Sequence, residues 1–252
     1  MIVIPTGDLH KGSPNCSVKH FDRHLKLLEQ PEYYTVCMGD LIESALKTSK
    51  GDVYRQVGTP QQQRDWVIKR LKPYKHKILA MCTGNHEDRI YDRTGVDMTS
   101  DMAKELGVYY RSEGVWLKIS FGSGNSRHED RPYVYWCYAT HGYGGARTSG
   151  AKAVKVERTA TFIHADFYMM AHDHVVNVGN SVYLMPDNRT SIDKETGWET
   201  GKGKAWEKKL VKTNSFLKWG NYGEVGGFPP SSLETPLVKL AGTGAPRVRV
   251  ES

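Results

Sequence analysis

Cysteines are few in this sequence, and long apolar runs are missing. The four cysteines lie far apart and include no C-x-x-C pair, which argues against a zinc knuckle or a disulfide framework and favours a reducing cytoplasm. No run of about 18 apolar residues occurs, so no membrane-spanning helix is expected. The opening MIVIPTGDLH has no basic segment before its short apolar run, so we expect no signal peptide and no membrane partner.

Acidic residues are also in deficit. The chain has 35 Lys+Arg against 28 Asp+Glu, a formal net charge of +7 and a sequence pI of about 9.1. A basic balance favours polyanionic partners such as nucleic acid, although charge carries no information about fold. At 252 residues the chain is long enough to bury a core without disulfides or structural metals, and we expect one domain over residues 1–252.

Short runs rich in β-branched and aromatic residues predict strands. These strands are expected at residues 1–5, 33–38, 77–82, 115–120, 133–139, 166–171, 175–185 and 236–241. Helical patterns lie at residues 17–29, 59–71, 99–106 and 150–160. Strands and helices alternate in the first half of the chain and strands dominate later, which predicts an α/β fold with a second sheet rather than one open sheet.

A Gly- and Lys-rich segment at 186–227 is weakly periodic, and we interpret it as a hairpin excursion with a mobile tip, inside the same domain. Aromatic residues interleave with its lysines, a pattern compatible either with stacking on the bases of single-stranded nucleic acid or with core packing. The aromatic residues concerned are Trp198, Trp206, Trp219 and Tyr222.

Metal-competent side chains follow five of the predicted strands. The carboxyl ends of strands form the crevice in which α/β sheets bind ligands, so these side chains can converge. Residues i and i+2 of an extended segment point the same way, which would pair Asp8 with His10 and His172 with His174. Mixed Asp, His and Asn donors fit divalent ions such as Mn²⁺, Fe²⁺, Co²⁺ or Zn²⁺. The five segments are Asp8-Leu9-His10, Asp40-Leu41-Ile42-Glu43, Asn85-His86-Glu87, His141-Gly142 and His172-Asp173-His174.

Three of these segments also have a simple structural explanation. Asp40 could cap a helix that begins at Leu41, Asn85 could occupy a turn, and His141 could be a half-buried histidine with satisfied hydrogen bonds. The order and placement of all five segments together favour one shared site, with Asp40 as the carboxylate that bridges two ions.

The same residues carry a family resemblance. Asp8-Leu9-His10, Gly39 to Glu43, Gly84 to Glu87, Thr140-His141-Gly142 and Ala171 to His174 resemble the ordered motifs of the calcineurin-like metallophosphoesterases, over residues 7–174. The resemblance implies a two-sheet β-sandwich flanked by helices, with a dinuclear metal centre at one end of the sheets. It assigns Asp8, His10, Asp40 and His174 to one ion, Asp40, Asn85, His141 and His172 to the other, and His86 to the substrate.

The motifs also depart from the family pattern at three positions. Glu43 and Ser44 stand where the second motif usually ends in Asp, often followed by Arg, which argues against a protein Ser/Thr phosphatase. Ala171 replaces the usual glycine of the last motif. The short outline resembles the small phosphoesterases of phages and prophages, and more distantly the nuclease subunits of double-strand-break repair complexes.

The expected chemistry needs no serine or cysteine nucleophile. Two divalent ions roughly 3.5 to 4 Å apart can share a hydroxide that attacks phosphorus in line. Manganese is the expected ion, with Fe, Zn, Co or Ni as alternatives. His86 follows a candidate ligand and is placed to protonate the leaving oxygen as a general acid, with Glu87 or Asp88 orienting its ring.

Basic residues beside the motifs could bind substrate phosphates. Arg89 and Arg147 are the candidates for this role, while Lys152 and Lys155 are either phosphate ligands or part of a solvated helix face. The sequence therefore favours a phosphodiesterase that acts on DNA or RNA. A phosphomonoesterase or cyclic-nucleotide phosphodiesterase for a small molecule is the alternative, followed by a non-catalytic binding scaffold.

A histidine pair outside the motifs is expected on the surface. His20 and His24 are spaced i, i+4 on the first predicted helix, but no third ligand accompanies them.

Overall fold

A computed structural model gives the structure of this chain and describes residues 1–49, 53–124, 131–220, 224, 227, 229–230 and 232–252. These described residues form ten strands in two five-stranded sheets. The first sheet has the order β10-β9-β1-β2-β3 and the second has the order β4-β5-β6-β8-β7. The first sheet comprises β1 (Ile2–Thr6), β2 (Tyr33–Met38), β3 (Ile78–Cys82), β9 (Leu237–Leu240) and β10 (Val248–Glu251). The second comprises β4 (Val115–Phe121), β5 (Tyr133–Thr140), β6 (Phe167–Met170), β7 (Asn177–Ile192) and β8 (Glu199–Lys212).

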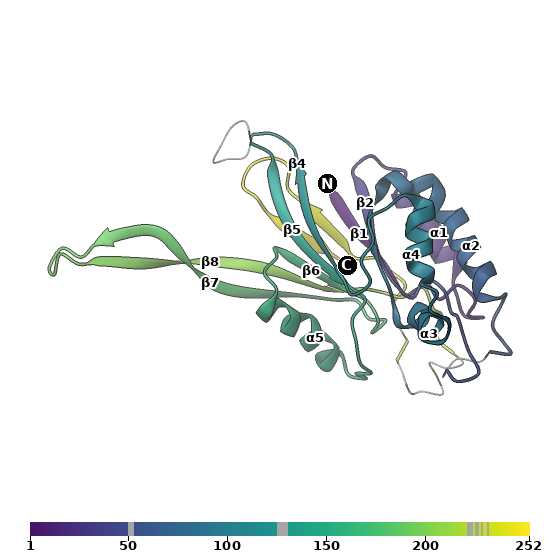
Figure 1. The fold of residues 1–252 in the computed structure, drawn as a ribbon. Helices are drawn as coiled ribbons and strands as arrows, with labels where there is room; N and C mark the ends of the chain where they lie inside the picture. Colours follow the sequence, from purple (N-terminus) through teal and green to yellow (C-terminus); the bar gives the residue numbers. More distant parts are fainter. Residues whose placement is uncertain (50–52, 125–130, 221–223, 225–226, 228, 231) are drawn as a thin grey trace.

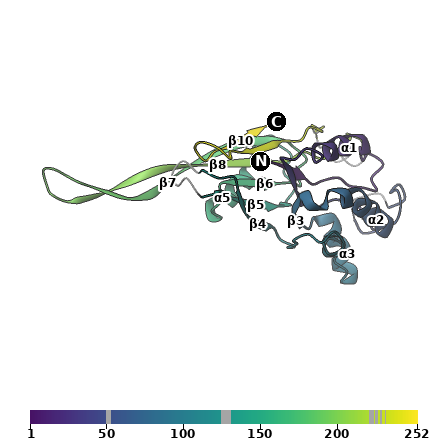
Figure 2. The same cartoon turned by 90° about the horizontal axis from the view of Figure 1, so that it is seen from above.

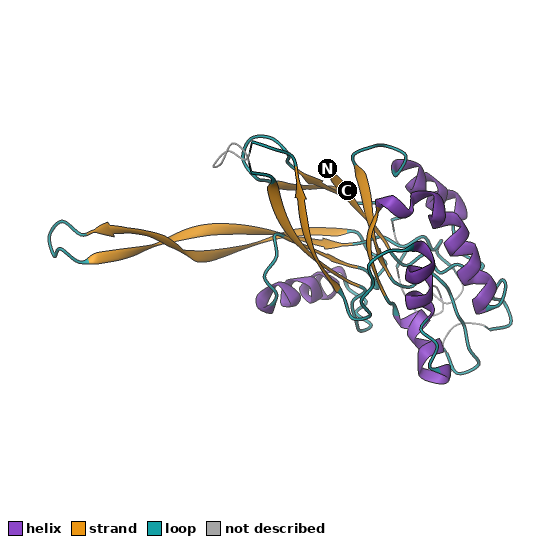
Figure 3. Cartoon of the chain, turned by 45° about the horizontal axis from the view of Figure 1, so that its top comes forward, coloured by secondary structure: helices purple, strands orange, loops and turns teal. Residues whose placement is uncertain are grey.

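The helices cover the outer faces of the two sheets (Figure 1, Figure 3). Those between residues 18 and 106 lie on the first sheet, and the helix over residues 149–162 lies on the second. A cluster of buried side chains from both sheets, including Val36, Ala80 and Val115, fills the space between the sheets. The structure therefore confirms the predicted α/β fold with two sheets flanked by helices. The helices are α1 (Val18–Leu27), α2 (Pro60–Leu71), the 3₁₀ helix η1 (Lys72–Lys77), α3 (Asn85–Thr94), α4 (Met98–Leu106) and α5 (Ser149–Phe162).

Burial explains why these strands can be predicted from the sequence. β1 pairs in parallel with β2, and β2 with β3, and these strands are apolar on both faces because they lie between the helices and the second sheet. In β4 and β5, buried residues such as Val115 and Tyr135 alternate with exposed ones such as Trp116 and Trp136. This alternation is that of an antiparallel pair with one face in solvent.

Helix α2 begins where the sequence signals a start. The Thr59 side chain accepts a hydrogen bond from the Gln62 N–H, and the Gln62 side chain accepts one from the Thr59 N–H, with Pro60 in the first turn. This capping box fixes the predicted boundary.

Four of the described elements were not predicted from the sequence, the 3₁₀ helix η1 among them. Helix α3 is short and polar with few apolar residues, so its period was not visible. Strand β8 lies in the Gly- and Lys-rich segment, and β10 contains only four residues. Strand β8 pairs with β6 as well as with β7, β10 pairs with β9, and Glu87 of α3 accepts hydrogen bonds from Asp40 and Ile42. Local propensity does not register such contacts.

Strands β7 and β8 form a long hairpin that projects away from the two sheets (Figure 1, Figure 2). Pairing runs from Asn177–Lys212 to Ile192–Glu199, with a bulge between Asp187 and Thr190. The hairpin thus begins before the expected excursion at 186–227 and returns before its end. Residues 221–223 and 225–226 of that excursion, including Tyr222, lie outside the described residues.

His24 is buried, contrary to the prediction of a surface position. Its ring packs between Phe21 and Phe216 and its exposed fraction is 2%. Nε2 lies 2.6 Å from the Thr6 hydroxyl and Nδ1 lies 3.0 Å from the Thr235 hydroxyl. Because this apolar setting disfavours the imidazolium, burial lowers the pKa of His24 to about 3.

We therefore expect the free energy of unfolding to fall as the pH drops below about 6.5. The unfolded chain binds a proton at His24 near pH 6.5, whereas the folded chain does not bind it until near pH 3. At pH 5 this difference costs about 2 kcal/mol relative to pH 7. Urea unfolding at both pH values measures the loss, and His24→Gln should show a loss smaller by about that amount. An equal pH dependence in the two proteins would contradict the assignment to His24.

Among the described residues, no helix has the length and apolar character needed to cross a membrane.

Candidate metal centre

The ends of five strands meet at one edge of the two sheets. Asp8 follows β1, Asp40 follows β2, and Asn85 is the first residue of α3, just after β3. His141 follows β5, and His172 and His174 follow β6. The structure thus brings together all seven of the predicted metal ligands, in two groups that share a cavity.

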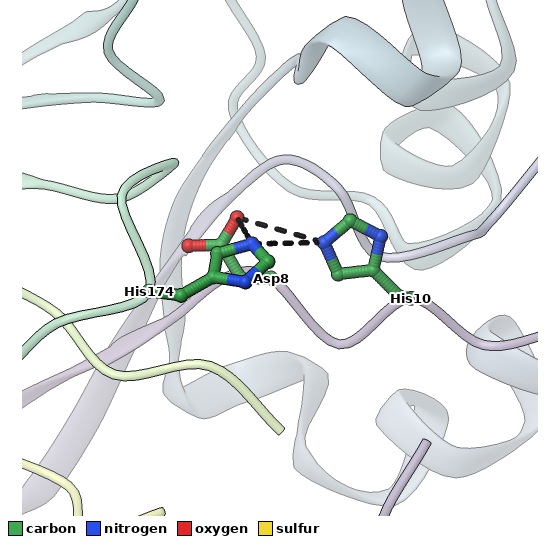
Figure 4. A group of neighbouring side chains, drawn as sticks. All are labelled: Asp8, His10 and His174. Carbon is green, nitrogen blue, oxygen red and sulfur yellow. Dashed lines mark hydrogen bonds and ion pairs between the residues drawn. The ribbon is translucent and has the colours of Figure 1, made fainter. Parts of the chain in front are cut away.

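The first group contains Asp8, His10 and His174 (Figure 4). His10 Nε2 lies 3.2 Å from His174 Nε2, and His174 Nε2 lies 3.3 Å from Asp8 Oδ1. Asp8 and His10 come from the first sheet and His174 from the second, so the group joins the two sheets.

The second group contains Asp40, Asn85, His141 and His172. His141 Nε2 lies 3.3 Å from Asp40 Oδ2 and 3.0 Å from Asn85 Oδ1. His172 Nδ1 lies 2.8 Å from Asn85 Oδ1 and 3.1 Å from His141 Nε2. Asp40, His141 and His172 place one ligand atom each within 4.8 Å of one another.

Asp40 lies between the two groups. The same oxygen that faces His141, Oδ2, is 3.7 Å from His10 Nε2. A carboxylate in this place can contribute to both groups, as expected for the bridging ligand.

Hydrogen bonds on the far side of three rings select the nitrogen that faces the centre. His10 Nδ1 donates to Glu43 Oε2 at 3.1 Å, and His141 Nδ1 donates to the Met38 carbonyl at 2.8 Å, which leaves Nε2 of each ring free. His172 is reversed: Nε2 donates to the Gly144 carbonyl, so Nδ1 faces inward. Such outer hydrogen bonds fix the tautomer of metal-binding histidines. Two of these partners, the carbonyls of Met38 and Gly144, belong to the main chain and carry no signal in the sequence.

The backbone at the centre is left-handed rather than extended. Asp8, His10, Asp40, His172 and His174 have φ values of 50°, 49°, 49°, 72° and 52°. The extended backbone expected for these segments is therefore wrong. Asp8 and His10 nevertheless lie in the same group, as predicted, whereas His172 and His174 enter different groups. Residues other than glycine adopt this conformation at a cost of about 1 kcal/mol or more each, and such strain gathers at functional sites.

Two motif glycines allow the ends of β2 and β3 to approach. Gly39 has a φ of 75°, and a Cβ on it would lie 2.2 Å from the Gly84 nitrogen. A Cβ on Gly84 would lie 2.2 Å from the Asp40 nitrogen. Only glycine fits at either position, which explains why both motifs place one before the ligand.

Glu87 stabilises the loop that carries Asp40. Its carboxylate is buried and accepts four main-chain hydrogen bonds, from Gly84, Asp40, Leu41 and Ile42, at 3.2, 2.9, 2.7 and 3.1 Å. Leu41 lies in a loop and does not begin a helix, so the alternative in which Asp40 is a helix cap is wrong.

Charged neighbours decide the pKa values at the centre. Burial alone would raise the pKa of Asp8, but His174 lowers it to about 2. Burial would likewise raise the pKa of Asp40, yet His141 and His86 hold it well below its usual range. Burial would lower the pKa of His141, but Asp40 raises it to about 10. Both carboxylates are therefore ionised at neutral pH, and the centre favours positive charge.

His86 lies beside Asp40, with 3.8 Å between its Nε2 and Asp40 Oδ2. Its Nδ1 donates to the Glu43 carbonyl at 2.7 Å and lies 3.7 Å from Glu43 Oε2. The expectation that Glu87 or Asp88 orients the ring is therefore wrong, since Glu43 does so. Burial lowers the pKa of His86 to about 4, with Asp40 opposing the shift.

A cavity of about 450 Å³ opens over both groups. Arg89 and Arg147 line it, as do Lys218 and Trp219. Trp198 instead lies far out on the hairpin segment with an exposed fraction of 75%, and Trp206 packs near His164. Of the interleaved aromatic residues that the structure describes, Trp219 is the one that lines the cavity.

Lys152 and Lys155 are buried, so the solvated helix face is excluded for both. Lys155 Nζ lies 2.6 Å from Asp173 Oδ1, and Lys152 Nζ donates to the Asp173 carbonyl at 2.9 Å. Asp173 therefore points to these lysines and away from the metal ligands on either side of it.

The spacing and chemistry of the ligand atoms fit divalent ions. Two ligand atoms that share an ion at about 2.1 Å lie about 3 to 3.4 Å apart, which matches the nitrogen pairs at 3.2 and 3.1 Å. Asp8 Oδ1 is buried and makes no hydrogen bond within the described part of the chain. A bound cation would satisfy this oxygen.

No protein-family model matches the chain, and a search of curated proteins returns no match. Among solved structures, vacuolar protein sorting 29 of Cryptosporidium parvum is 14% identical with a TM-score of 0.49, over 99% of this chain and 96% of that chain. A single mutant of Vps29 from Entamoeba histolytica is 11% identical with a TM-score of 0.48, over 100% and 98%. A predicted phosphoesterase of Streptococcus pneumoniae is 9% identical with a TM-score of 0.41, over 99% and 97%.

Proposed function

We propose that this chain is a dinuclear metal-dependent phosphodiesterase that hydrolyses DNA or RNA. The observation that carries the proposal is the pair of ligand groups that share Asp40 beneath a cavity lined by arginines. Seven ligands with two carboxylates, four imidazoles and one amide suit first-row ions. Manganese is our first choice, with Fe, Zn, Co or Ni as alternatives.

The residues assigned to the ions follow the two groups. Asp8, His10 and His174 would hold one ion, Asn85, His141 and His172 the other, and Asp40 would serve both. The chemistry that two divalent ions would supply there is activation of water for attack on phosphorus and neutralisation of the phosphoryl oxygens.

We assign to His86 the protonation of the leaving oxygen. Its Nδ1 is held by the Glu43 carbonyl, so Nε2 faces the centre beside Asp40. The negative charge of a phosphodiester in the cavity raises the pKa of the ring. An alkoxide is a poor leaving group, so protonation by a positioned acid contributes about 10² to 10⁴ in rate.

The walls of the cavity support a nucleic-acid substrate. The guanidinium groups of Arg89 and Arg147 and the Lys218 ammonium can bind phosphates on either side of the scissile bond. Trp219, exposed to 52%, offers a face for base stacking. The formal net charge of +7 adds long-range attraction.

The size of the cavity favours a second candidate. A volume of about 450 Å³ is typical of small-molecule sites, so a phosphomonoester or cyclic nucleotide also fits. The two candidates differ in how activity depends on the length of an oligonucleotide.

The test compares substrates with and without a chelator. The wild type should hydrolyse bis-p-nitrophenyl phosphate and shorten end-labelled oligonucleotides in Mn²⁺, and lose both activities in EDTA. His86→Ala should lose about 10² to 10⁴ in rate on oligonucleotides. It should lose less on the bis-ester, because p-nitrophenolate leaves without much help from an acid. His76→Ala, at an exposed histidine outside the centre, serves as the matched control.

Three results would change the proposal. Turnover confined to p-nitrophenyl phosphate or cyclic nucleotides would favour the second candidate. If His86→Ala lost equal rates on oligonucleotides and on bis-p-nitrophenyl phosphate, His86 would not be the general acid. A folded protein that binds metal but hydrolyses none of these substrates would favour the scaffold.

A further inference from the structure

Three buried lysines surround one aspartate directly beneath the metal centre. Asp173 lies between His172 and His174, and its side chain is 2% exposed. Lys155 Nζ lies 2.6 Å from its Oδ1, and Lys212 Nζ, fully buried, lies 2.7 Å from its Oδ2. Each carboxylate oxygen thus forms an ion pair with a different ammonium group, one from α5 and one from β8.

The lysines also hold the main chain of the turn. Lys212 Nζ donates to the Ala171 carbonyl at 2.8 Å, and Lys152 Nζ donates to the Asp173 carbonyl at 2.9 Å. On either side of Asp173, His172 and His174 have φ values of 72° and 52°. A left-handed conformation at two histidines one residue apart persists only where the surroundings enforce it. The hydrogen bonds from Lys212 and Lys152 to the main chain provide that constraint.

The charges of this cluster would not help to attract the proposed metal ions. Three ammonium groups against one carboxylate leave an excess of positive charge close to the proposed ions, which opposes their binding. Burying these charges is itself unfavourable unless geometry and hydrogen bonds compensate. The observed contacts therefore point to a geometric role.

We propose that Asp173, Lys155 and Lys212 are positioning residues that fix the turn carrying His172 and His174. The inference rests on the proposed metal centre. Because His174 belongs to one ligand group and His172 to the other, loosening the turn weakens both metal sites together. A defect in a single ligand would act mainly on one.

The test is a titration of the protein with Mn²⁺, followed by the paramagnetic resonance signal of free Mn²⁺, with no substrate present. Lys155→Met and Lys212→Met should each weaken both binding steps by about 10-fold to 100-fold, the usual effect of changing a residue that supports metal ligands. Lys155→Arg, which keeps a cation near Asp173, should restore most of the affinity.

Lys208→Met is the matched control. Lys208 is a buried lysine of the same strand β8, but its ammonium contacts the Ala160 carbonyl and the Tyr183 ring instead of the turn. Its removal should leave Mn²⁺ affinity unchanged. Circular dichroism shows whether each variant folds, and if Lys212→Met does not, Lys155→Met carries the test because the Lys212–Asp173 pair remains.

The possible failures are distinguishable. Unchanged or tighter Mn²⁺ binding in Lys155→Met would overturn the positioning role, since tighter binding is what relief of the excess charge alone would give. A folded wild type that binds neither Mn²⁺ nor Zn²⁺ would instead overturn the proposed metal centre, together with the inference that rests on it.

Discussion

Asp40→Asn is expected to reduce the hydrolysis of bis-p-nitrophenyl phosphate by at least about 10³. Asp40 Oδ2 faces ligands of both groups, His141 at 3.3 Å and His10 at 3.7 Å, so the change removes a charge from both proposed ion sites. Stabilisation of the transition state by metal ions contributes several kcal/mol, and about 4 kcal/mol corresponds to about 10³ in rate. Initial rates in Mn²⁺ measure the effect.

The reason for the loss can be separated from unfolding. Asn is close in shape to Asp, so the variant should keep its circular dichroism spectrum while losing Mn²⁺ affinity. Asp92→Asn, at an exposed position of α3, should retain wild-type rates. A rate within about 10-fold of wild type for Asp40→Asn would contradict the shared role of this carboxylate.

Glu87→Ala is expected to lower the free energy of unfolding by about 4 kcal/mol. The carboxylate accepts hydrogen bonds from four main-chain N–H groups, each of which would be left without its partner. A buried donor without a partner costs about 1 to 3 kcal/mol, although water that enters the space left by the side chain would reduce the sum. Urea unfolding measures the change.

Glu87→Gln should remove only part of this stabilisation. One amide oxygen can keep the pair of hydrogen bonds at one carboxylate oxygen, while the NH₂ group cannot accept the other pair. We expect a loss of about 2 to 3 kcal/mol, between the wild type and Glu87→Ala. Glu105→Ala removes a partly exposed glutamate of α4 near Arg64 and should cost less than about 1 kcal/mol. Equal losses for the Gln and Ala variants would show that the hydrogen bonds are not the cause.

The positions of the ligands could be predicted from the sequence because each follows a buried strand. Asp8, Asp40 and His141 come within two residues of the ends of β1, β2 and β5, and parallel strands place such ends at one edge. The presence of a second sheet followed from the alternation of strands and helices early in the chain and the run of strands later. The packing of the two sheets into a sandwich was implied only by the family resemblance.

The rest of the centre depends on contacts that a linear pattern does not contain. The hydrogen bonds of His141 and His172 go to the carbonyls of Met38 and Gly144, and every residue type has a carbonyl. In the sequence, Lys155 looks like a residue of a solvent-exposed helix face. It is buried because the fold brings β8 and the turn after β6 beside α5. The left-handed backbone at the ligands has no sequence signal at Asp or His.

Each ligand group draws on both sheets, and this has a consequence for assembly. Residues 8 and 174 are separated by most of the chain, so neither group exists until the two sheets have packed against each other. Contacts between residues so far apart in the chain form late in folding, because the intervening chain must first lose conformational entropy. An ion bound at either group would act as a cross-link between the sheets, and its binding free energy would add to the stability of the packed state but not to that of either sheet alone.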